Sequence, residues 1–332
     1  MDALTKLHNC FREGVIPEKF KKILKSFFTS YKDTLISRGK DMSYINTTLC
    51  TFLELIRNQF VSPYRFEPYH QGLRVPFDYY GFGNEFFRPI VDIENSRILK
   101  LSNVDRMIVQ LQNKDNVILF GNHQTEIEPQ LISILLEETH PNFAANMIFV
   151  SGDRVRIDPV AAPLSMGRNL LCIYSKKYID VPPEMRARKQ QYNQRSLNVL
   201  AELLNDGGKC IYVAPSGGRD RLNEHGIPEI APFDPQSVEL FMLMAQKSQK
   251  CVHFYPMALD TYDVLPPPKE SSVEIGEERH YNYSDIAICF GDEISIDAFP
   301  SSEGLSKIER RRVRADYIRG LVKYDYDIIT GN

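Results

Sequence analysis

The stretch NVILFGNHQTEIEPQLISILLEET, residues 116–139, contains the change of pattern that decides the fold. Its first five residues form a short apolar run that is typical of a buried strand. Pro129 is well placed as the first residue of a helix, and an apolar stripe at Leu131, Ile134 and Leu135 follows at helical spacing. The polar residues between the two runs therefore lie in a turn that joins a strand to a helix.

The same alternation of short apolar runs and helical segments continues along the chain. Further strand-like runs lie at 147–150, 170–174, 209–214, 252–259 and 286–291, and helical segments lie at about 129–139, 186–206 and 235–248. This order predicts an α/β fold with a mixed, largely parallel sheet flanked by helices. Ligands bind beyond the carboxyl ends of the strands in such sheets, and the polar motifs of this chain follow strand-like runs.

The first 75 residues have a different, helical character. In residues 19–35, KFKKILKSFFTSYKDTL, apolar side chains recur at helical spacing with lysines between them, and 47–60 is similar. A stretch rich in proline and aromatic residues follows at 62–83. We predict a small helical bundle domain over 1–75 and a larger α/β domain over 76–332, which closes with a basic helix. The lysine-rich helix is expected to present a solvated face, with contact to an acidic carrier protein or a membrane surface left open.

The composition excludes several classes of protein. The chain has 332 residues, enough for a substantial core, and a formal net charge of −3. That charge gives no bulk electrostatic case for nucleic acid as a partner, so an anionic ligand needs a local basic patch. No apolar run reaches roughly 18 residues, which argues against a membrane-spanning helix.

The cysteines and the N-terminus bear on the cellular compartment. The cysteines form neither a CxxC pair nor a cluster at metal-ligand spacing, and they predict buried thiols in a reducing compartment. They are Cys10, Cys50, Cys172, Cys210, Cys251 and Cys289. The first residues, MDALTKLHNCFREG, lack the apolar segment of a signal peptide and the Arg/Ser richness of a transit peptide. We therefore expect a soluble intracellular protein that needs no metal and no cofactor.

The turn after the first strand contains a candidate acid–base pair. A histidine needs a partner on one ring nitrogen to fix its tautomer, and a carboxylate serves this purpose. His123 can then take a proton from an alcohol that attacks a carbonyl group, with Glu128 as the orienting acid and Glu126 as the fallback. The alternative is an ordinary histidine in a surface turn.

The segment APSGGRDR, residues 214–221, is a candidate phosphate clamp. Residues two apart in extended backbone point to the same side, so Arg219 and Arg221 are able to grip one phosphate. The preceding Gly217 and Gly218 allow a close approach of the backbone. A charged surface turn with a local Arg–Asp pair is the alternative. The lysines at 176 and 177 add positive charge at a third strand end.

At these residues the chain resembles the soluble, plastid-type glycerol-3-phosphate acyltransferases. The resemblance extends over roughly residues 75 to 295 and includes PFDYYGFGNEFFRPIVD, NHQTEIEP, GDRVRIDP, PLSMGRNLLCIYSKKY, APSGGRDR, APFDPQSV and ALDTYDVLPPP. It implies a small helical domain before the α/β domain. It also implies transfer of a fatty acyl group from an acyl carrier protein or coenzyme A thioester to the sn-1 hydroxyl of glycerol-3-phosphate.

The family's site residues map onto this chain with two departures. The resemblance implies a catalytic histidine at His123 and an acid five positions later, where Glu128 replaces the usual aspartate. It implies phosphate contacts by Lys177, Arg219 and Arg221, and by Tyr178, which stands where a histidine is usual. Glutamate reaches about 1.5 Å further than aspartate, and a small backbone or rotamer adjustment would absorb that difference. The tyrosine still donates a hydrogen bond through its hydroxyl.

Three functional hypotheses follow from these residues. The first is direct sn-1 acylation without an acyl-enzyme, with an oxyanion site formed by backbone amides near 121–129 or by the Gly217–Gly218 loop. Ser216 lies in that loop but not in a G-x-S-x-G elbow, which disfavours it as a nucleophile. The rivals are acylation of 1-acylglycerol-3-phosphate and non-catalytic binding of an acyl carrier or a phosphorylated ligand. We predict a cytoplasmic location, with the plastid stroma as the alternative.

Overall fold

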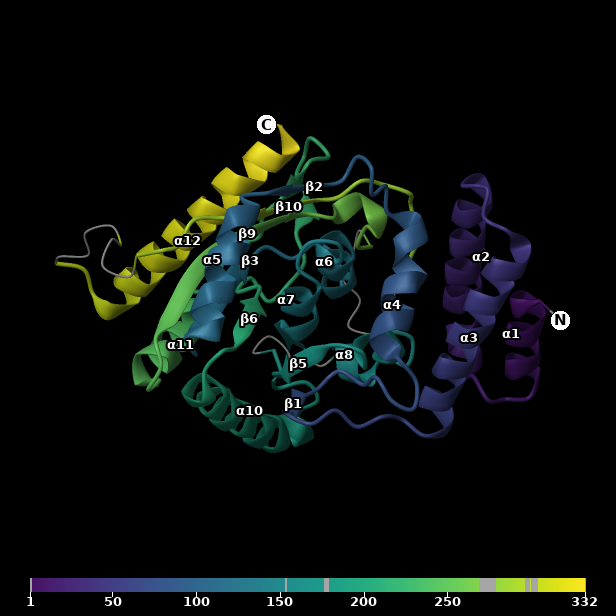
Figure 1. Ribbon diagram of the computed structural model, residues 1–332. Coiled ribbons are helices and arrows are strands. Elements are labelled where there is room, and N and C mark those ends of the chain that lie inside the picture. The colour runs from purple at the N-terminus through teal and green to yellow at the C-terminus, as the bar shows by residue number, and fades with distance from the viewer. Residues whose placement is uncertain are drawn as a thin grey trace.

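A central eight-stranded sheet organises the protein, whose computed structural model is shown in Figure 1. The structure describes residues 2–152, 154–175, 179–268, 279–295, 299 and 304–331. The strands of the sheet are β1 (Tyr69–His70), β2 (Arg97–Leu99), β3 (Asn116–Gly121), β4 (Ile148–Ser151), β5 (Asn169–Cys172), β6 (Cys210–Val213), β9 (Val252–Asp260) and β10 (Ala287–Phe290).

The order across the sheet is β1-β5-β4-β6-β3-β9-β10-β2. The five strands from β5 to β9 run parallel, so their carboxyl ends lie along one edge. β1 is antiparallel to β5, and β10 is antiparallel to β9 but parallel to β2. The predicted mixed, largely parallel sheet is confirmed, and each strand-like run of the sequence forms one of its strands.

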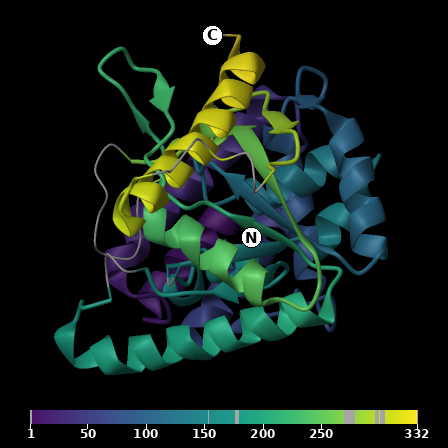
Figure 2. The same cartoon turned by 90° about the vertical axis from the view of Figure 1, so that its left-hand side faces the viewer.

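Helices cover both faces of the sheet. On one face lie α5 (Leu101–Gln112), α6 (Glu128–Leu136) and α7 (Pro141–Asn146), and on the other lie α10 (Arg186–Asp206), α11 (Pro235–Lys247) and α12 (Lys307–Thr330). Figure 2 shows α10, α11 and α12 as the layer in front of the sheet. Successive strand residues point to opposite faces, so Val117 and Leu119 pack under the first layer and Ile118 and Phe120 under the second.

The N-terminal helices pack on the outer side of α4 (Tyr79–Phe87), away from the sheet (Figure 1). They are α1 (Ala3–Arg12), α2 (Lys21–Ser37) and α3 (Met42–Val61), and their apolar faces share one buried cluster with α4 and α6. The ring of Tyr31 stacks on Phe86 at 4.3 Å between centroids, and its hydroxyl donates to the Phe86 carbonyl at 2.8 Å. The domain boundary near residue 75 stays a prediction.

Shorter elements connect these layers. They are α8 (Arg154–Ile157), α9 (Ala162–Ser165), the hairpin of β7 (Arg221–Leu222) with β8 (Pro228–Glu229), and 3-10 turns at Glu18–Phe20, Arg88–Ile90, Pro183–Met185 and Tyr262–Val264. Among the described residues, no helix is both long enough and apolar enough to cross a membrane.

The prediction of buried thiols is correct for four of the six cysteines. All six are free, but Cys251 is exposed and Cys50 is half-buried. Cys251 directly precedes β9, at the edge of the sheet where that strand begins. Cys50 lies on α3 beside the core of the helical bundle rather than within it.

Candidate active site

Buried polar contacts fix the backbone of the turn that follows β3. A side chain at Gly121 would meet the ring of Tyr212 at 2.5 Å, so this close approach requires glycine. Asn122 is fully buried, and its side chain donates to the Leu259 carbonyl at 2.9 Å and accepts from the Leu259 amide at 2.8 Å. The turn is therefore tied to β9, and His123 follows at a fixed place on the carboxyl edge of the sheet.

His123 and Glu128 are in direct contact. The Nδ1 atom of His123 lies 2.7 Å from Oε2 of Glu128. The other carboxylate oxygen accepts hydrogen bonds from the backbone amides of Gln124 at 2.5 Å and Thr125 at 3.1 Å. Glu128 is buried and is the first residue of α6, one residue before the predicted helix start, where the helix dipole favours a negative charge. The glutamate side chain thus spans the whole turn and uses both of its oxygens.

The contact with Glu128 sets the chemistry of His123. Donation of Nδ1–H to the carboxylate leaves the lone pair on Nε2. No described residue hydrogen-bonds to Nε2, and the side chain is 29% exposed. Burial lowers the pKa of His123, but the charge and the hydrogen bond of Glu128 outweigh this effect, so the pKa lies above its ordinary value. The imidazole is therefore oriented as a base whose Nε2 has no hydrogen bond to a described residue.

Replacement of Glu128 by glutamine is expected to lower the pKa of His123. Glutamine keeps the length of the side chain but removes the negative charge that stabilises the imidazolium. A histidine-selective NMR titration measures this directly, with the pKa above about 6.5 in the wild type and lower in Glu128→Gln. The resonance of His225, which is exposed in the turn between β7 and β8, serves as the internal reference. An unchanged His123 titration would show that Glu128 does not govern this imidazole.

Asp220 binds the segment after β6 to the same turn. Its amide donates to the His123 carbonyl at 2.6 Å, and its buried carboxylate accepts from the side chain of Asn122 and the amide of Ala231, both at 2.9 Å. Burial raises the pKa of Asp220 to about 6. The sequence analysis considered Asp220 only in the alternative of a local Arg–Asp pair, and it missed this role. The sequence did contain a signal for this role. Side chains alternate in direction along extended backbone, so Asp220, the central residue of RDR, points away from Arg219 and Arg221.

The two arginines of the predicted clamp have different partners. Nη1 of Arg219 donates to Oε2 of Glu126 at 3.0 Å, and Nη1 of Arg221 donates to the Pro268 carbonyl at 2.6 Å. The positive charge of Arg219 acts on His123, where it works to lower the pKa. The structure therefore brings the clamp segment beside the candidate base, and Arg219 is already paired with the carboxylate of Glu126.

Glu126 lies between Arg219 and a second guanidinium group. Nε and Nη2 of Arg279 lie 2.8 and 2.7 Å from Oε1 of Glu126. Burial raises the pKa of Glu126, but Arg279 and Arg219 outweigh it and keep the pKa below its ordinary value. Glu126 is therefore an ionised partner of two arginines, and Glu128 makes the contact with His123. Arg279 was not predicted, because it is 153 positions from Glu126 and stands in no motif.

The two glycine amides of the 217–218 loop differ in their partners within the described chain. The amides of Gln124 and Thr125 are engaged by Glu128, and the amide of Gly217 donates to the Ala214 carbonyl at 3.2 Å. The amide of Gly218 has no acceptor in the described part of the chain. Gly217 has a φ of +60°, which favours glycine at this position.

Ser216 is engaged within the same loop. Its hydroxyl donates to the carbonyl of Gly218 at 2.8 Å, so it is not hydrogen-bonded to His123. A serine nucleophile requires a base within hydrogen-bonding distance of its oxygen. Ser216 therefore stabilises the loop in this structure.

Lys177 and Tyr178, the other two predicted phosphate ligands, lie outside the described residues. Their roles stay predictions, as does that of the neighbouring lysine at 176. The described chain leaves β5 at Cys172, on the same edge of the sheet as His123. Within the described ranges, no group of three His, Cys, Asp or Glu side chains is placed to hold a metal ion.

Comparison with known proteins identifies relatives over most of the chain. The family model described as "Acyltransferase" matches residues 103–260, which include His123 and Arg219. Two chloroplast glycerol-3-phosphate acyltransferases of Cucurbita moschata are 37% and 39% identical, over 87% and 86% of this chain. The chain spans only 65% and 62% of the length of these relatives.

A solved structure and a further relative complete the comparison. The 1-acyl-sn-glycerophosphate acyltransferase of Thermotoga maritima aligns with a TM-score of 0.44 at 17% identity, over 76% of this chain and 79% of that one, and this distant likeness carries no information on function. The chloroplast glycerol-3-phosphate acyltransferase of Pisum sativum is 35% identical over 98% of this chain and 72% of its own length. On this relationship, the chain belongs to the family of plant chloroplast glycerol-3-phosphate acyltransferases.

Proposed function

We propose that the protein transfers a fatty acyl group from a thioester to the sn-1 hydroxyl of glycerol-3-phosphate. The observation that carries this proposal is the His123–Glu128 pair, 2.7 Å apart, hydrogen-bonded through the backbone to the segment that contains Arg219 and Arg221. A base beside an anion clamp suits an acceptor that is both an alcohol and a phosphate. The names of the chloroplast relatives agree with this reaction.

Binding of the acceptor places its hydroxyl at the base. Arg219 and Arg221 hold the phosphate through guanidinium hydrogen bonds, with Lys177 and Tyr178 as further proposed contacts. The phosphate replaces Glu126 as the partner of Arg219. Arg279 keeps Glu126 paired during this exchange, so that no bare carboxylate faces the incoming anion. Held in this way, the sn-1 oxygen meets Nε2 of His123 with little further loss of freedom.

In the chemical step, His123 accepts a proton from the acceptor hydroxyl and then passes it to the leaving thiolate. Nε2 of His123 accepts the hydroxyl proton as the sn-1 oxygen forms a bond to the thioester carbon. The carbonyl oxygen becomes an oxyanion, for which the amide of Gly218 is the available donor in the glycine loop. Collapse of the tetrahedral intermediate breaks the carbon–sulfur bond, and the imidazolium returns the proton to the departing thiolate. Glu128 stabilises the imidazolium between these two transfers.

The partners follow from this reaction. The donor is an acyl thioester of acyl carrier protein or coenzyme A, and the acceptor is glycerol-3-phosphate. The relatives are named chloroplastic, which favours the plastid over the cytoplasmic location predicted from the sequence. Imaging of the tagged protein in its own cells tests the location.

Comparison of two acceptors tests the reaction. Long-chain acyl thioesters of carrier protein and of coenzyme A are each incubated with labelled glycerol-3-phosphate and with labelled 1-acylglycerol-3-phosphate. We expect 1-acylglycerol-3-phosphate as the product from the first acceptor and little turnover of the second. Turnover of the second acceptor alone would establish the rival acylation. Binding of glycerol-3-phosphate without transfer from either donor would establish a non-catalytic binder.

Shortening Glu128 to aspartate is expected to lower kcat by about 10–100-fold. The carboxylate would withdraw by about 1.5 Å, and it could no longer reach both Nδ1 of His123 and the two amides of the turn. The KM for glycerol-3-phosphate should change little, because Glu128 does not touch the arginines. Glu138→Asp, an exposed change just beyond the end of the same helix, is the matched control. Full activity of Glu128→Asp would show that the backbone of the turn adjusts to either acid.

A further inference from the structure

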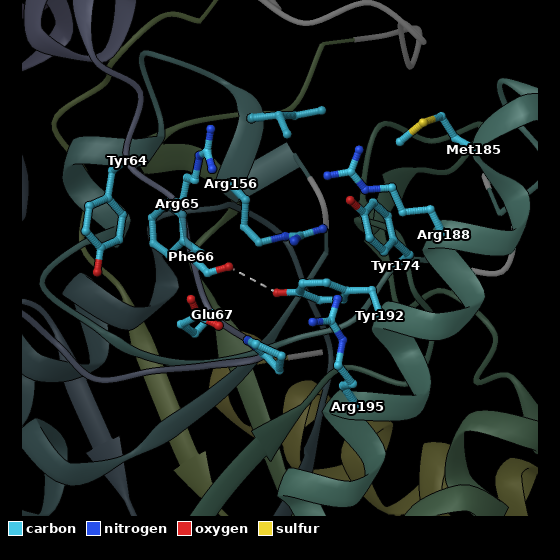
Figure 3. A pocket seen from close by; sticks show the side chains of 12 residues that line it. Tyr64, Arg65, Phe66, Glu67, Arg156, Tyr174, Met185, Arg188, Tyr192 and Arg195 are labelled. Carbon is cyan, nitrogen blue, oxygen red and sulfur yellow. Dashed lines mark hydrogen bonds between the residues drawn. The ribbon is translucent and has the colours of Figure 1, made fainter.

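A second basic site lies on the same edge of the sheet as His123. A pocket of about 590 Å³ opens between the chain that leads into β1, the end of α8 and the first turns of α10. Its cationic lining comes from Arg65, Arg156, Arg188 and Arg195, whereas Glu67 carries the one carboxylate among its twelve lining residues. Figure 3 shows Arg156 and Arg188 entering the pocket from different elements, with Tyr174 and Tyr192 below and beside them.

The four arginines of this pocket exceed its single carboxylate, that of Glu67, within the described chain. None of its four arginines forms an ion pair with a carboxylate within the described chain. Arg156 is held in place by two aromatic rings, with its guanidinium carbon 4.3 Å from the ring centre of Tyr174 and 4.4 Å from that of Tyr192. Its Nε and Nη2 are buried, with no hydrogen-bond partner among the described residues. Guanidinium groups arranged in this way are suited to an anionic oxygen ligand, above all a phosphate.

The position of the pocket relates it to the candidate base. Arg156 follows β4 and Tyr174 follows β5, and both strands run parallel to β3, which precedes His123. The order β5-β4-β6-β3 and a strand spacing of about 4.8 Å place the strand ends about 10 and 14 Å from the end of β3. A ligand that reacts at His123 and also occupies this pocket must span a separation of this order.

We propose that this pocket binds the phosphate at the far end of the pantetheine arm of the acyl donor. Carrier protein and coenzyme A share this arm, which separates the thioester from a phosphate by a flexible chain. The inference rests on the proposed function, because it identifies the pocket as the donor subsite of the same reaction. The acceptor phosphate binds at Arg219 and Arg221, so the two phosphates of the reaction have separate sites. The pocket then holds the carrier end of the donor, and the thioester carbonyl at the other end of the arm lies at His123.

Donors with and without this phosphate provide the test. Long-chain acyl thioesters of pantetheine, 4′-phosphopantetheine, coenzyme A and carrier protein are compared in the wild type and in the double variant Arg188→Gln, Arg195→Gln. Both side chains are exposed on α10, so the variant is expected to fold. We expect the wild type to prefer phosphopantetheine over pantetheine by at least tenfold in kcat/KM, and the variant to lose most of that preference. The KM for glycerol-3-phosphate and the rate with acyl-pantetheine should stay unchanged.

The controls separate this inference from its alternatives. Arg186→Gln removes one positive charge from α10, outside the pocket lining, and should keep the preference for the phosphorylated arm. Loss of kcat/KM with acyl-carrier protein, with acyl-coenzyme A or with both supports the proposal and identifies the source of the arm. Equal use of pantetheine and phosphopantetheine by the wild type overturns it, as does a preference that survives in the double variant.

A binding measurement distinguishes failure of this inference from failure of the proposed function. Calorimetry with unreactive 4′-phosphopantetheine is expected to show a Kd in the double variant at least tenfold above that of the wild type. If no acyl transfer to glycerol-3-phosphate occurs and this difference persists, the reaction is wrong and the phosphate site stands. If transfer occurs and the Kd is the same in both proteins, the reaction stands and the phosphate site is wrong.

Discussion

Replacement of His123 by alanine is expected to lower kcat for acyl transfer by about 10²–10⁴-fold, the usual contribution of a positioned general base. The substitution removes the nitrogen that accepts the hydroxyl proton and later returns it to the thiolate. His123 is 29% exposed and its carbonyl, rather than its ring, supports Asp220, so the fold should be retained. Steady-state kinetics with glycerol-3-phosphate and a long-chain thioester measure the loss, and circular dichroism checks the fold.

The same experiment separates the base from the binding site. The KM for glycerol-3-phosphate should change by only a small factor in His123→Ala, because the phosphate contacts remain. His225→Ala, in the exposed turn between β7 and β8, should behave as the wild type. The kcat/KM of the wild type should also fall about tenfold per pH unit below the pKa of His123, because only the neutral imidazole accepts a proton. Retention of more than a tenth of the activity in His123→Ala would remove the histidine from the mechanism.

Removal of both clamp arginines is expected to lower kcat/KM for glycerol-3-phosphate by about 10²–10⁴-fold. Each charge-assisted hydrogen bond to phosphate contributes about 1.5–3 kcal/mol, so two of them contribute about 3–6 kcal/mol. In the double variant Arg219→Gln, Arg221→Gln, the loss should appear mainly as a higher KM for the acceptor. A fall in kcat should accompany it, because the hydroxyl is no longer held at His123. Glu126 keeps Arg279 as its partner, so the variant should fold.

A second pair of arginines provides the matched control. Arg310→Gln, Arg312→Gln removes the same charge at the same spacing from the exposed start of α12 and should leave the kinetics unchanged. The KM for the donor should stay the same in the clamp variant, since the donor has its own proposed phosphate site. If the loss falls on the donor instead, Arg219 and Arg221 bind the carrier and not the acceptor.

Local patterns predicted the elements that repeat one physical signal over many residues. The run at 116–120 became β3 because its buried residues face helices on both sides of the sheet. The predicted helix at 186–206 agrees with α10 residue for residue. Elements without such a signal were missed. β2 is one of them, because its three residues are too few to show a period. α1 was covered only by the helical character expected of the first 75 residues, and only three of its ten residues are buried.

The residue types of the candidate site were predictable because the chemistry restricts them. A histidine and a carboxylate after a strand, and two arginines behind a glycine pair, are patterns within a few consecutive residues. The choice of Glu128 over Glu126 as the orienting acid stays a prediction, and in the structure Glu128 contacts His123 while Glu126 pairs with Arg219. The first turn of α6 decides this, because it directs Glu128 back over the amides of its own turn.

The sequence by itself determined the succession of the main strands and helices along the chain, the family, and which side chains are suited to acid–base and anion-binding chemistry. Only the tertiary structure decided which of them meet. Asp220 became an internal anchor because the sheet places β6 beside β3, and Arg279 reached Glu126 from 153 residues away. The basic pocket gathers its arginines from three separate segments. Such contacts join residues far apart in the chain, and no local pattern encodes a distance that exists only after the core has packed.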